Sequence, residues 1–235
     1  MLARAACHDA PVRGDNVGRT ALAELVGTAL LVTAVVGSGI AAQRLSPDDI
    51  GLQLLENALV TGAALVALIL ALGPVSAAFN PLVTLAERLF GMISSRTAAW
   101  HLAAQFTGGA LGAVVANLMF ELPAVDVAER VRSSGGLWLG EAVATFGLLL
   151  VIFGVIRSGR VTHVAYAVGG YITAAYWFTS STSFANPAVT VARTLSDTFA
   201  GIAPRSVPMF LAMQVLGGLL AVAAVRVLHP EVVDG

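Results

Sequence analysis

The stretch "SFANPAVTVAR", residues 183–193, places Asn-Pro inside an apolar run. Asn-Pro is a helix-start signal, because Asn is a favoured N-cap and Pro fits the first helical turn. Residues 77–88 read "AAFNPLVTLAER", which is nearly the same phrase. Two copies of one interruption, far apart in the chain, predict an internal duplication.

Composition indicates a membrane protein. The chain has 235 residues, of which 57% are hydrophobic and 11% are charged, whereas soluble domains carry about 25% charged residues. The net charge of −1 gives no electrostatic case for binding nucleic acid. The lone cysteine, Cys7, permits neither an intrachain disulfide nor a thiolate metal site. We predict no cofactor and no bound metal.

Six apolar stretches approach the roughly 20 residues that a membrane-spanning helix needs. Residues 1–19 are expected to form a cytoplasmic tail, 121–135 an extracellular connector and 229–235 a C-terminal tail. Eight of the thirteen arginines fall on one side of this arrangement, so the positive-inside rule predicts that both termini are cytoplasmic in a plasma (inner) membrane. The six stretches are residues 20–42, 50–72, 97–120, 136–156, 161–178 and 207–228.

The two halves share their landmarks in one order. Each has a Glu in its first helix (Glu24, Glu141), then the Asn-Pro phrase, then a Gln with a Gly pair in its third helix (Gln105, Gln214). Because three helices per repeat is an odd number, the second repeat must lie inverted across the membrane. We therefore predict an all-α membrane protein with an inverted 3+3 repeat, residues 20–120 and 136–228.

The Asn-Pro phrases predict two re-entrant half-helices, over residues 80–91 and 186–199. Each is about 16–20 Å long, too short for a hydrocarbon core of about 30 Å, so the two together would make one span. Irregular backbone at that depth is tolerated beside water, so the loops before Asn80 and Asn186 are expected to line a wet pore. The loop residues concerned are Ala77, Ala78, Phe79, Ser183, Phe184 and Ala185.

This arrangement favours polar, uncharged solutes. The Asn80 and Asn186 amides would offer donors at the centre, and both half-helix N-termini would point positive dipole ends there, which repels cations. Glu24 and Glu141 lie in spanning helices. Placing a carboxylate inside the membrane costs free energy, so its presence there indicates a functional role. Their symmetric placement favours bracing the re-entrant loops through hydrogen bonds; a proton relay is the alternative.

These motifs resemble those of the aquaporin, or major intrinsic protein, family. The resemblance spans nearly the whole chain after the N-terminal tail. It implies six spanning helices, two half-helices, homotetramers with one pore per subunit, and passive conduction of water or small neutral solutes. The paired pore motifs that carry it are Asn80-Pro81-Leu82 and Asn186-Pro187-Ala188.

The sequence departs from the family pattern at its selectivity filter. Val189 stands where the family usually has Arg, which implies a wider and less polar filter; Arg193, one turn further on, is an alternative source of the charge. Leu82 replaces Ala and either braces the half-helix tip or narrows the centre. The resemblance places the other filter residues at Thr61 and at Tyr176 or Trp177.

This filter resembles that of a bacterial branch associated with arsenic resistance, which implies permeation by arsenite and related neutral metalloid hydroxides. We predict a passive channel for small uncharged solutes, with water and glycerol-like polyols as further candidates. A water-selective pore is the alternative within the channel class. An ion-coupled secondary transporter would need further ion-coordinating residues, and an intramembrane enzyme would need a Ser/His or Asp pair that we do not find.

Overall fold

The computed structural model describes residues 16–230. Cys7 and most of the two predicted tails lie outside this part. The described chain is helical and contains no strand. Five of its helices are long and apolar enough to cross a membrane: α1 (Val17–Leu45), α2 (Ile50–Leu72), α4 (Ser95–Met119), α5 (Gly135–Arg157) and α8 (Val207–Leu228).

The sixth predicted span is built from two pieces. Helix α6 (Val164–Phe178) has only 15 residues. The 3₁₀ turn η1 (Val161–His163) directly precedes it, so the two together cover the predicted range 161–178. At about 1.5 Å per residue, α6 needs this extra turn to approach the thickness of the bilayer core.

Side-chain caps explain where several helices begin. The Asp49 carboxylate accepts a hydrogen bond from the Leu52 N–H (2.9 Å) at the start of α2. Ser94 and Ser134 cap α4 and α5 in the same way. Such caps satisfy one of the N–H groups that the first helical turn leaves without a partner.

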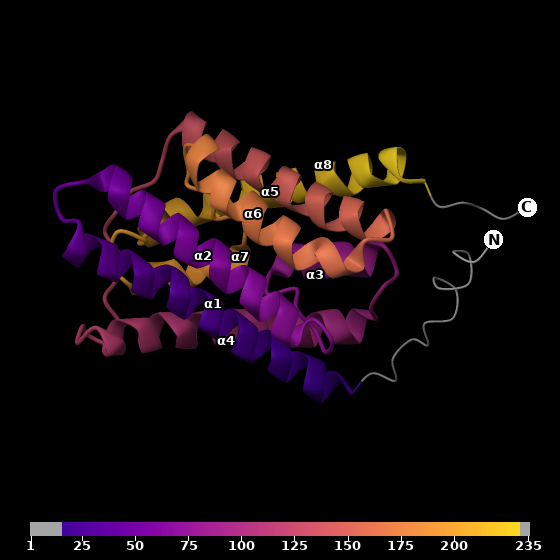
Figure 1. Cartoon of the computed structure of the whole chain (residues 1–235), viewed down its shortest axis with the longest axis horizontal. Helices are drawn as coiled ribbons and strands as arrows, with labels where there is room; N and C mark the ends of the chain where they lie inside the picture. The colour runs from indigo at the N-terminus through magenta and orange to yellow at the C-terminus, as the bar shows by residue number, and fades with distance from the viewer. Residues whose placement is uncertain (1–15, 231–235) are drawn as a thin grey trace, which may run out of the picture.

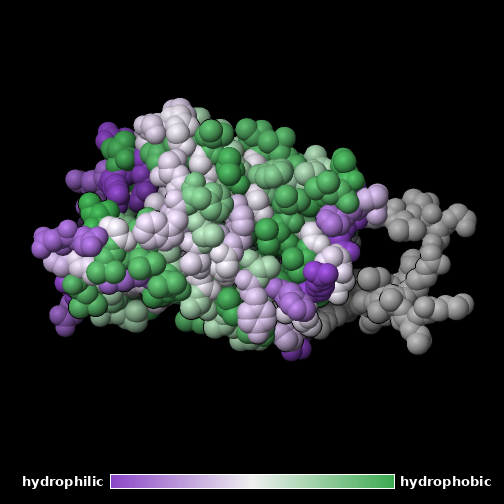
Figure 2. Space-filling model, turned by 45° about the horizontal axis from the view of Figure 1, so that its top comes forward, coloured by the Kyte–Doolittle hydropathy of each residue, from purple (hydrophilic) through white to green (hydrophobic). Residues whose placement is uncertain are grey.

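The long helices run side by side as a bundle around two short helices, α3 (Pro81–Leu89) and α7 (Pro187–Ala192) (Figure 1). The start of α1 and the end of α8 lie at the same end of the bundle (Figure 1). On the face drawn in Figure 2, strongly polar residues gather toward the two ends, and the middle is covered by apolar residues mixed with weakly polar ones. A belt of this kind suits contact with lipid.

Equivalent helices of the two repeats pack in the same way. Helix α1 packs along α4, and α5 packs along α8. A Cβ atom on Gly108 would lie 2.3 Å from the Leu25 carbonyl oxygen, and one on Gly217 would lie 2.3 Å from the Ala142 oxygen. The glycine pairs therefore allow the same close backbone approach in both repeats.

Both short helices end earlier than the ranges 80–91 and 186–199 predicted from the sequence. Helix α3 ends at Leu89, and Gly91 then turns the chain with a φ of 75°. Helix α7 ends at Ala192 and is followed by the 3₁₀ turn η2 (Arg193–Leu195). No helical turn directly follows η2, where the Leu195 carbonyl accepts the Asp126 N–H of the connector at 3.0 Å instead of a helical partner.

Candidate functional site

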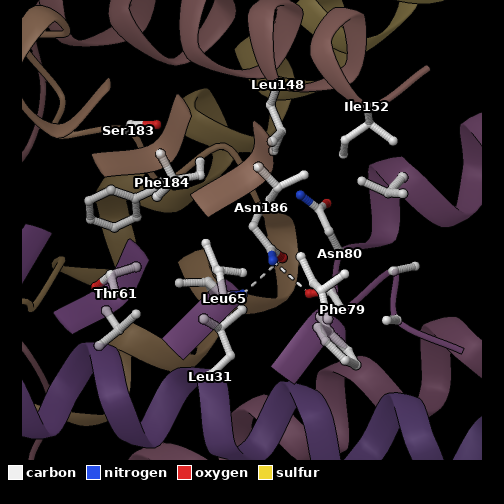
Figure 3. A pocket seen from close by; sticks show the side chains of 18 of the residues that line it. Leu31, Thr61, Leu65, Phe79, Asn80, Leu148, Ile152, Ser183, Phe184 and Asn186 are labelled. Atoms are coloured by element: carbon white, nitrogen blue, oxygen red, sulfur yellow. Dashed lines mark hydrogen bonds between the residues drawn. The ribbon is translucent and has the colours of Figure 1, made fainter. Parts of the chain in front are cut away.

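The two short helices meet at their N-termini through the two asparagines. The Asn80 Nδ2 donates to the Ala185 carbonyl oxygen at 2.8 Å, and the Asn186 Nδ2 donates to the Phe79 carbonyl oxygen at 2.7 Å. Figure 3 shows the two amides close together in one cavity. Each repeat thus holds the loop of the other, and the contact is reciprocal.

Each asparagine also caps its own helix. The Asn80 Oδ1 accepts the Leu82 N–H at 2.9 Å, and the Asn186 Oδ1 accepts the Ala188 N–H at 3.0 Å. An amide NH₂ carries two N–H groups, and each asparagine uses one of them for the opposite loop. Both side chains line the cavity, so the second N–H can serve a solute there.

The residue before each asparagine has a left-handed backbone. Phe79 and Ala185 both have a φ of 48°, a conformation that costs a residue other than glycine about 1–2 kcal/mol. Their carbonyl oxygens are the two that the opposite asparagines contact. The strained backbone therefore aims each carbonyl across the interface between the repeats.

Glu24 holds the first loop in this conformation. Its carboxylate is fully buried and accepts hydrogen bonds from the Ala78 N–H (2.8 Å) and the Phe79 N–H (2.7 Å). It also accepts the Ser76 hydroxyl (2.5 Å) and the Gln105 amide (2.8 Å). Four donors thus satisfy this intramembrane carboxylate.

Glu141 holds the second loop in the same way. It is fully buried and accepts the Phe184 N–H at 2.9 Å, the Ala185 N–H at 3.0 Å and the Gln214 amide at 2.5 Å. Neither Glu24 nor Glu141 lines the cavity. The geometry therefore favours loop bracing over a proton relay.

A cavity of about 130 Å³ surrounds the asparagine contact. About 10–15 Å³ suffices for one water molecule, so several small molecules fit. Its wall is mostly aliphatic, with polar groups at few positions. The predicted pore and filter residues that line it are Thr61, Ala77, Ala78, Phe79, Asn80, Tyr176, Ser183, Phe184, Asn186 and Val189.

Other predicted residues lie outside the cavity lining. Of the two aromatic candidates on α6, Tyr176 is buried and lines the cavity, whereas Trp177 is 52% exposed on the outside of the bundle. Leu82 is buried beside Leu149 of α5 and Gly218 of α8, so it packs the helix tip instead of narrowing the centre. Ala185, Pro81, Pro187 and Ala188 support the site without lining the cavity.

The filter candidates gather beyond Asn186; we call this region the α7 end of the cavity. The Thr61 and Tyr176 hydroxyl oxygens lie 3.1 Å apart and are buried. The Ser183 Oγ is also buried, and no described residue is its hydrogen-bond partner. These hydroxyls and the aliphatic Val189 line this end of the cavity together with one charged side chain, that of Arg193.

Arg193 also lines the cavity. Its side chain is 1% exposed, and its guanidinium carbon lies 3.5 Å from the centre of the Phe184 ring. Its Nε donates to the Ala200 carbonyl oxygen. Arg132 of the connector lies 5.0 Å from the same ring, and burial together with the nearby Arg193 and Arg130 lowers the pKa of Arg132.

The sequence interpretation overlooked Glu87, which lines the opposite end of the cavity; we call it the α3 end. A signal was present in the sequence. Glu87 follows Asn80 by seven residues, and Arg193 follows Asn186 by the same seven. Since seven residues make nearly two helical turns, a charged residue there shares a face with the asparagine.

Comparisons with known proteins agree with this architecture. The sequence model of a family described as "Major intrinsic protein" matches residues 12–163. Aquaglyceroporin AqpS of Rhizobium meliloti (strain 1021) is 49% identical over 212 residues, covering 90% of each chain. Probable aquaporin AqpM of Archaeoglobus fulgidus is 31% identical over 77% of this chain and 84% of its own.

The fold matches a solved structure as well. The X-ray structure of the aquaglyceroporin from Plasmodium falciparum superposes with a TM-score of 0.69, covering 92% of this chain and 97% of that chain at 18% identity. That likeness concerns the fold alone. Together with the family match and the curated relatives, it confirms the predicted inverted-repeat membrane fold: the chain belongs to the major intrinsic protein family.

Proposed function

We propose that this chain is a passive membrane channel for small uncharged solutes. The observation that carries the proposal is the cavity at the meeting point of the two short helices, lined by both asparagines and an otherwise mostly aliphatic wall. Hydrogen-bond donors beside the positive ends of two helix dipoles suit neutral molecules that carry hydroxyl groups. The 49% identity to an aquaglyceroporin supports glycerol-like polyols as substrates besides water.

The α7 end of the cavity acts as the selectivity filter. Thr61 and Tyr176 offer hydroxyls at that end, and Val189 leaves the position after the second Asn-Pro-Ala uncharged. A filter with Val at this position admits solutes wider than water, including neutral metalloid hydroxides such as arsenite. Polyols and arsenous acid present several hydroxyls, which match these groups.

The channel lies in the plasma membrane with both termini cytoplasmic and assembles as a homotetramer with one pore per subunit. The positive-inside distribution of arginines supports the orientation, and the family resemblance supports the tetramer. Under this proposal no cofactor takes part. Loop bracing by Glu24 and Glu141 keeps the pore open without an ion gradient.

Stopped-flow light scattering of proteoliposomes tests this function, with water, glycerol and arsenite gradients applied in parallel. We expect each solute to enter these proteoliposomes faster than vesicles without protein. The rates should not depend on sodium or proton gradients. Water flux without glycerol or arsenite flux would favour the water-selective alternative. Solute flux that follows an imposed ion gradient would favour a secondary transporter.

A further inference from the structure

The two short helices present matching stripes to the cavity. Positions 0, 3 and 7 counted from each asparagine fall on one helical face, because the angle between successive residues is about 100°. All six residues at these positions line the cavity. The first stripe is Asn80, Val83 and Glu87, and the second is Asn186, Val189 and Arg193.

The stripes differ in the sign of the charge at their last position. Glu87 and Arg193 are the only charged side chains that line this cavity in the described chain. Because the helices meet at their N-termini, their last positions point away from each other. Each charge lies roughly 10 Å along the helix axis from its asparagine, Glu87 within α3 and Arg193 at the first residue of η2, directly after α7.

Neither charge is neutralised by an ion pair with another described residue. Arg193 stacks on the Phe184 ring, which leaves its charge intact, and uses its Nε for the Ala200 carbonyl. In residues 16–230, no hydrogen bond or ion pair holds the Glu87 carboxylate, and the charged group that acts on it is the Glu24 carboxylate, which has the same sign. Both groups are therefore placed to act on whatever passes.

A channel with this geometry has to reject anions as well as cations. Each helix N-terminus carries about half a positive charge, and two of them face the centre. Arg193 adds a full positive charge at the α7 end. The buried Glu24 and Glu141 carboxylates offset part of this positive charge from behind the loops. Glu87 is the only described residue with a carboxylate that lines the cavity itself, in the path of a passing anion.

We propose that Glu87, in its ionised form, is the anion barrier of this channel, at the opposite end of the cavity from its repeat counterpart Arg193, so that ions of either sign meet a like charge while neutral solutes pass. This inference rests on the proposed function, because it presupposes a conducting cavity. It also gives a reason for the opposite signs at equivalent positions of the two repeats.

The test measures nitrate entry into proteoliposomes loaded with an anion-sensitive dye. Glycerol entry is measured in the same vesicles. The measurements are made at about pH 9, where carboxyl groups stay ionised even if burial raises their pKa well above the ordinary value near 4. Glu87→Gln removes the charge and keeps the shape, whereas Glu87→Asp keeps the charge. Glu121→Gln makes the same charge change on the exposed surface, outside the cavity.

We expect Glu87→Gln to raise nitrate permeability on the order of tenfold, the effect of one charge acting over roughly 10 Å in a protein interior. Glycerol permeability should stay within about twofold. Glu87→Asp and Glu121→Gln should keep the low nitrate permeability of the wild type. Adding Arg193→Gln to Glu87→Gln should lower nitrate permeability again, because the attraction from Arg193 is gone.

Unchanged nitrate permeability in Glu87→Gln with intact glycerol flux would overturn the inference and leave the proposed function standing. An equal nitrate leak in Glu87→Asp would also overturn it, since shape and not charge would then be responsible. If Glu87→Gln does not reconstitute, Glu87→Asn replaces it with the same expectations. Wild-type vesicles that pass no glycerol would refute the proposed function and the inference with it.

Discussion

Replacing Glu24 by Gln should release the first re-entrant loop. Glu24 accepts four hydrogen bonds, two at each carboxylate oxygen. In Gln, one oxygen becomes an NH₂ group, which faces two donors and can accept from neither. Hydrogen bonds to charged groups contribute about 1.5–3 kcal/mol each, so two losses amount to roughly 3–6 kcal/mol. The lower burial cost of a neutral amide offsets part of this, and we expect a net local loss of about 2–4 kcal/mol.

Amide hydrogen exchange of the reconstituted channel measures this loss at the loop. The Ala78 and Phe79 N–H groups are bonded to Glu24, so their protection should fall by about 30-fold to 700-fold, at 1.4 kcal/mol per factor of ten. Solute flux should fall with it, because the Phe79 carbonyl would no longer be held toward Asn186.

Glu56→Gln is the matched control for this experiment. Glu56 also lies on a spanning helix, but its carboxylate accepts the Ser46 hydroxyl at 2.9 Å, far from the re-entrant loop. It should leave the protection of Ala78 and Phe79 unchanged. Wild-type protection of both amides in Glu24→Gln would refute the bracing role.

Three further predictions concern the filter and the helix contacts. Val189→Arg should narrow the α7 end and reduce glycerol and arsenite permeability more than water permeability, as read by stopped-flow scattering; equal reductions would contradict a filter at Val189. Tyr176→Phe removes the hydroxyl that meets Thr61 at 3.1 Å and should lower the glycerol-to-water permeability ratio by about twofold to tenfold, the value of one hydrogen bond. Gly108→Ala would place a methyl group 2.3 Å from the Leu25 carbonyl oxygen and should destabilise the channel by about 1–3 kcal/mol in detergent melts. Gly170→Ala lies in a helix interior where a Cβ meets nothing within 4 Å, so it should not lower the melting temperature.

The duplicated landmarks made most of the fold predictable from the sequence. Asn80 and Asn186 mark helix starts through local capping chemistry, which depends on few neighbours. Apolar stretches of about 20 residues predict spanning helices because the bilayer sets their length. The symmetric position of Glu24 and Glu141 pointed to bracing, and the structure supplies the hydrogen bonds for it.

Features that depend on tertiary contacts were less accessible to sequence reasoning. The chain is not helical directly beyond η2, where the connector's Asp126 and Ala128 N–H groups bond to the last carbonyls. The choice between Tyr176 and Trp177 depends on how α6 is rotated against α2, which a uniformly apolar helix does not reveal. Glu87 was overlooked because a charged residue near the end of a short helix is usually exposed to solvent. Its spacing of seven residues from Asn80 nevertheless placed it on the same helical face.

Tryptophan substitution on α3 tests most directly whether solutes pass through the cavity between the two asparagines. Val83 is buried in the cavity wall, whereas Leu85, two residues along the same helix, is 40% exposed on the outside. We predict that Val83→Trp abolishes glycerol flux in stopped-flow measurements and that Leu85→Trp conducts like the wild type, with both variants reconstituted equally well. Wild-type glycerol flux through Val83→Trp would contradict a pathway along this cavity.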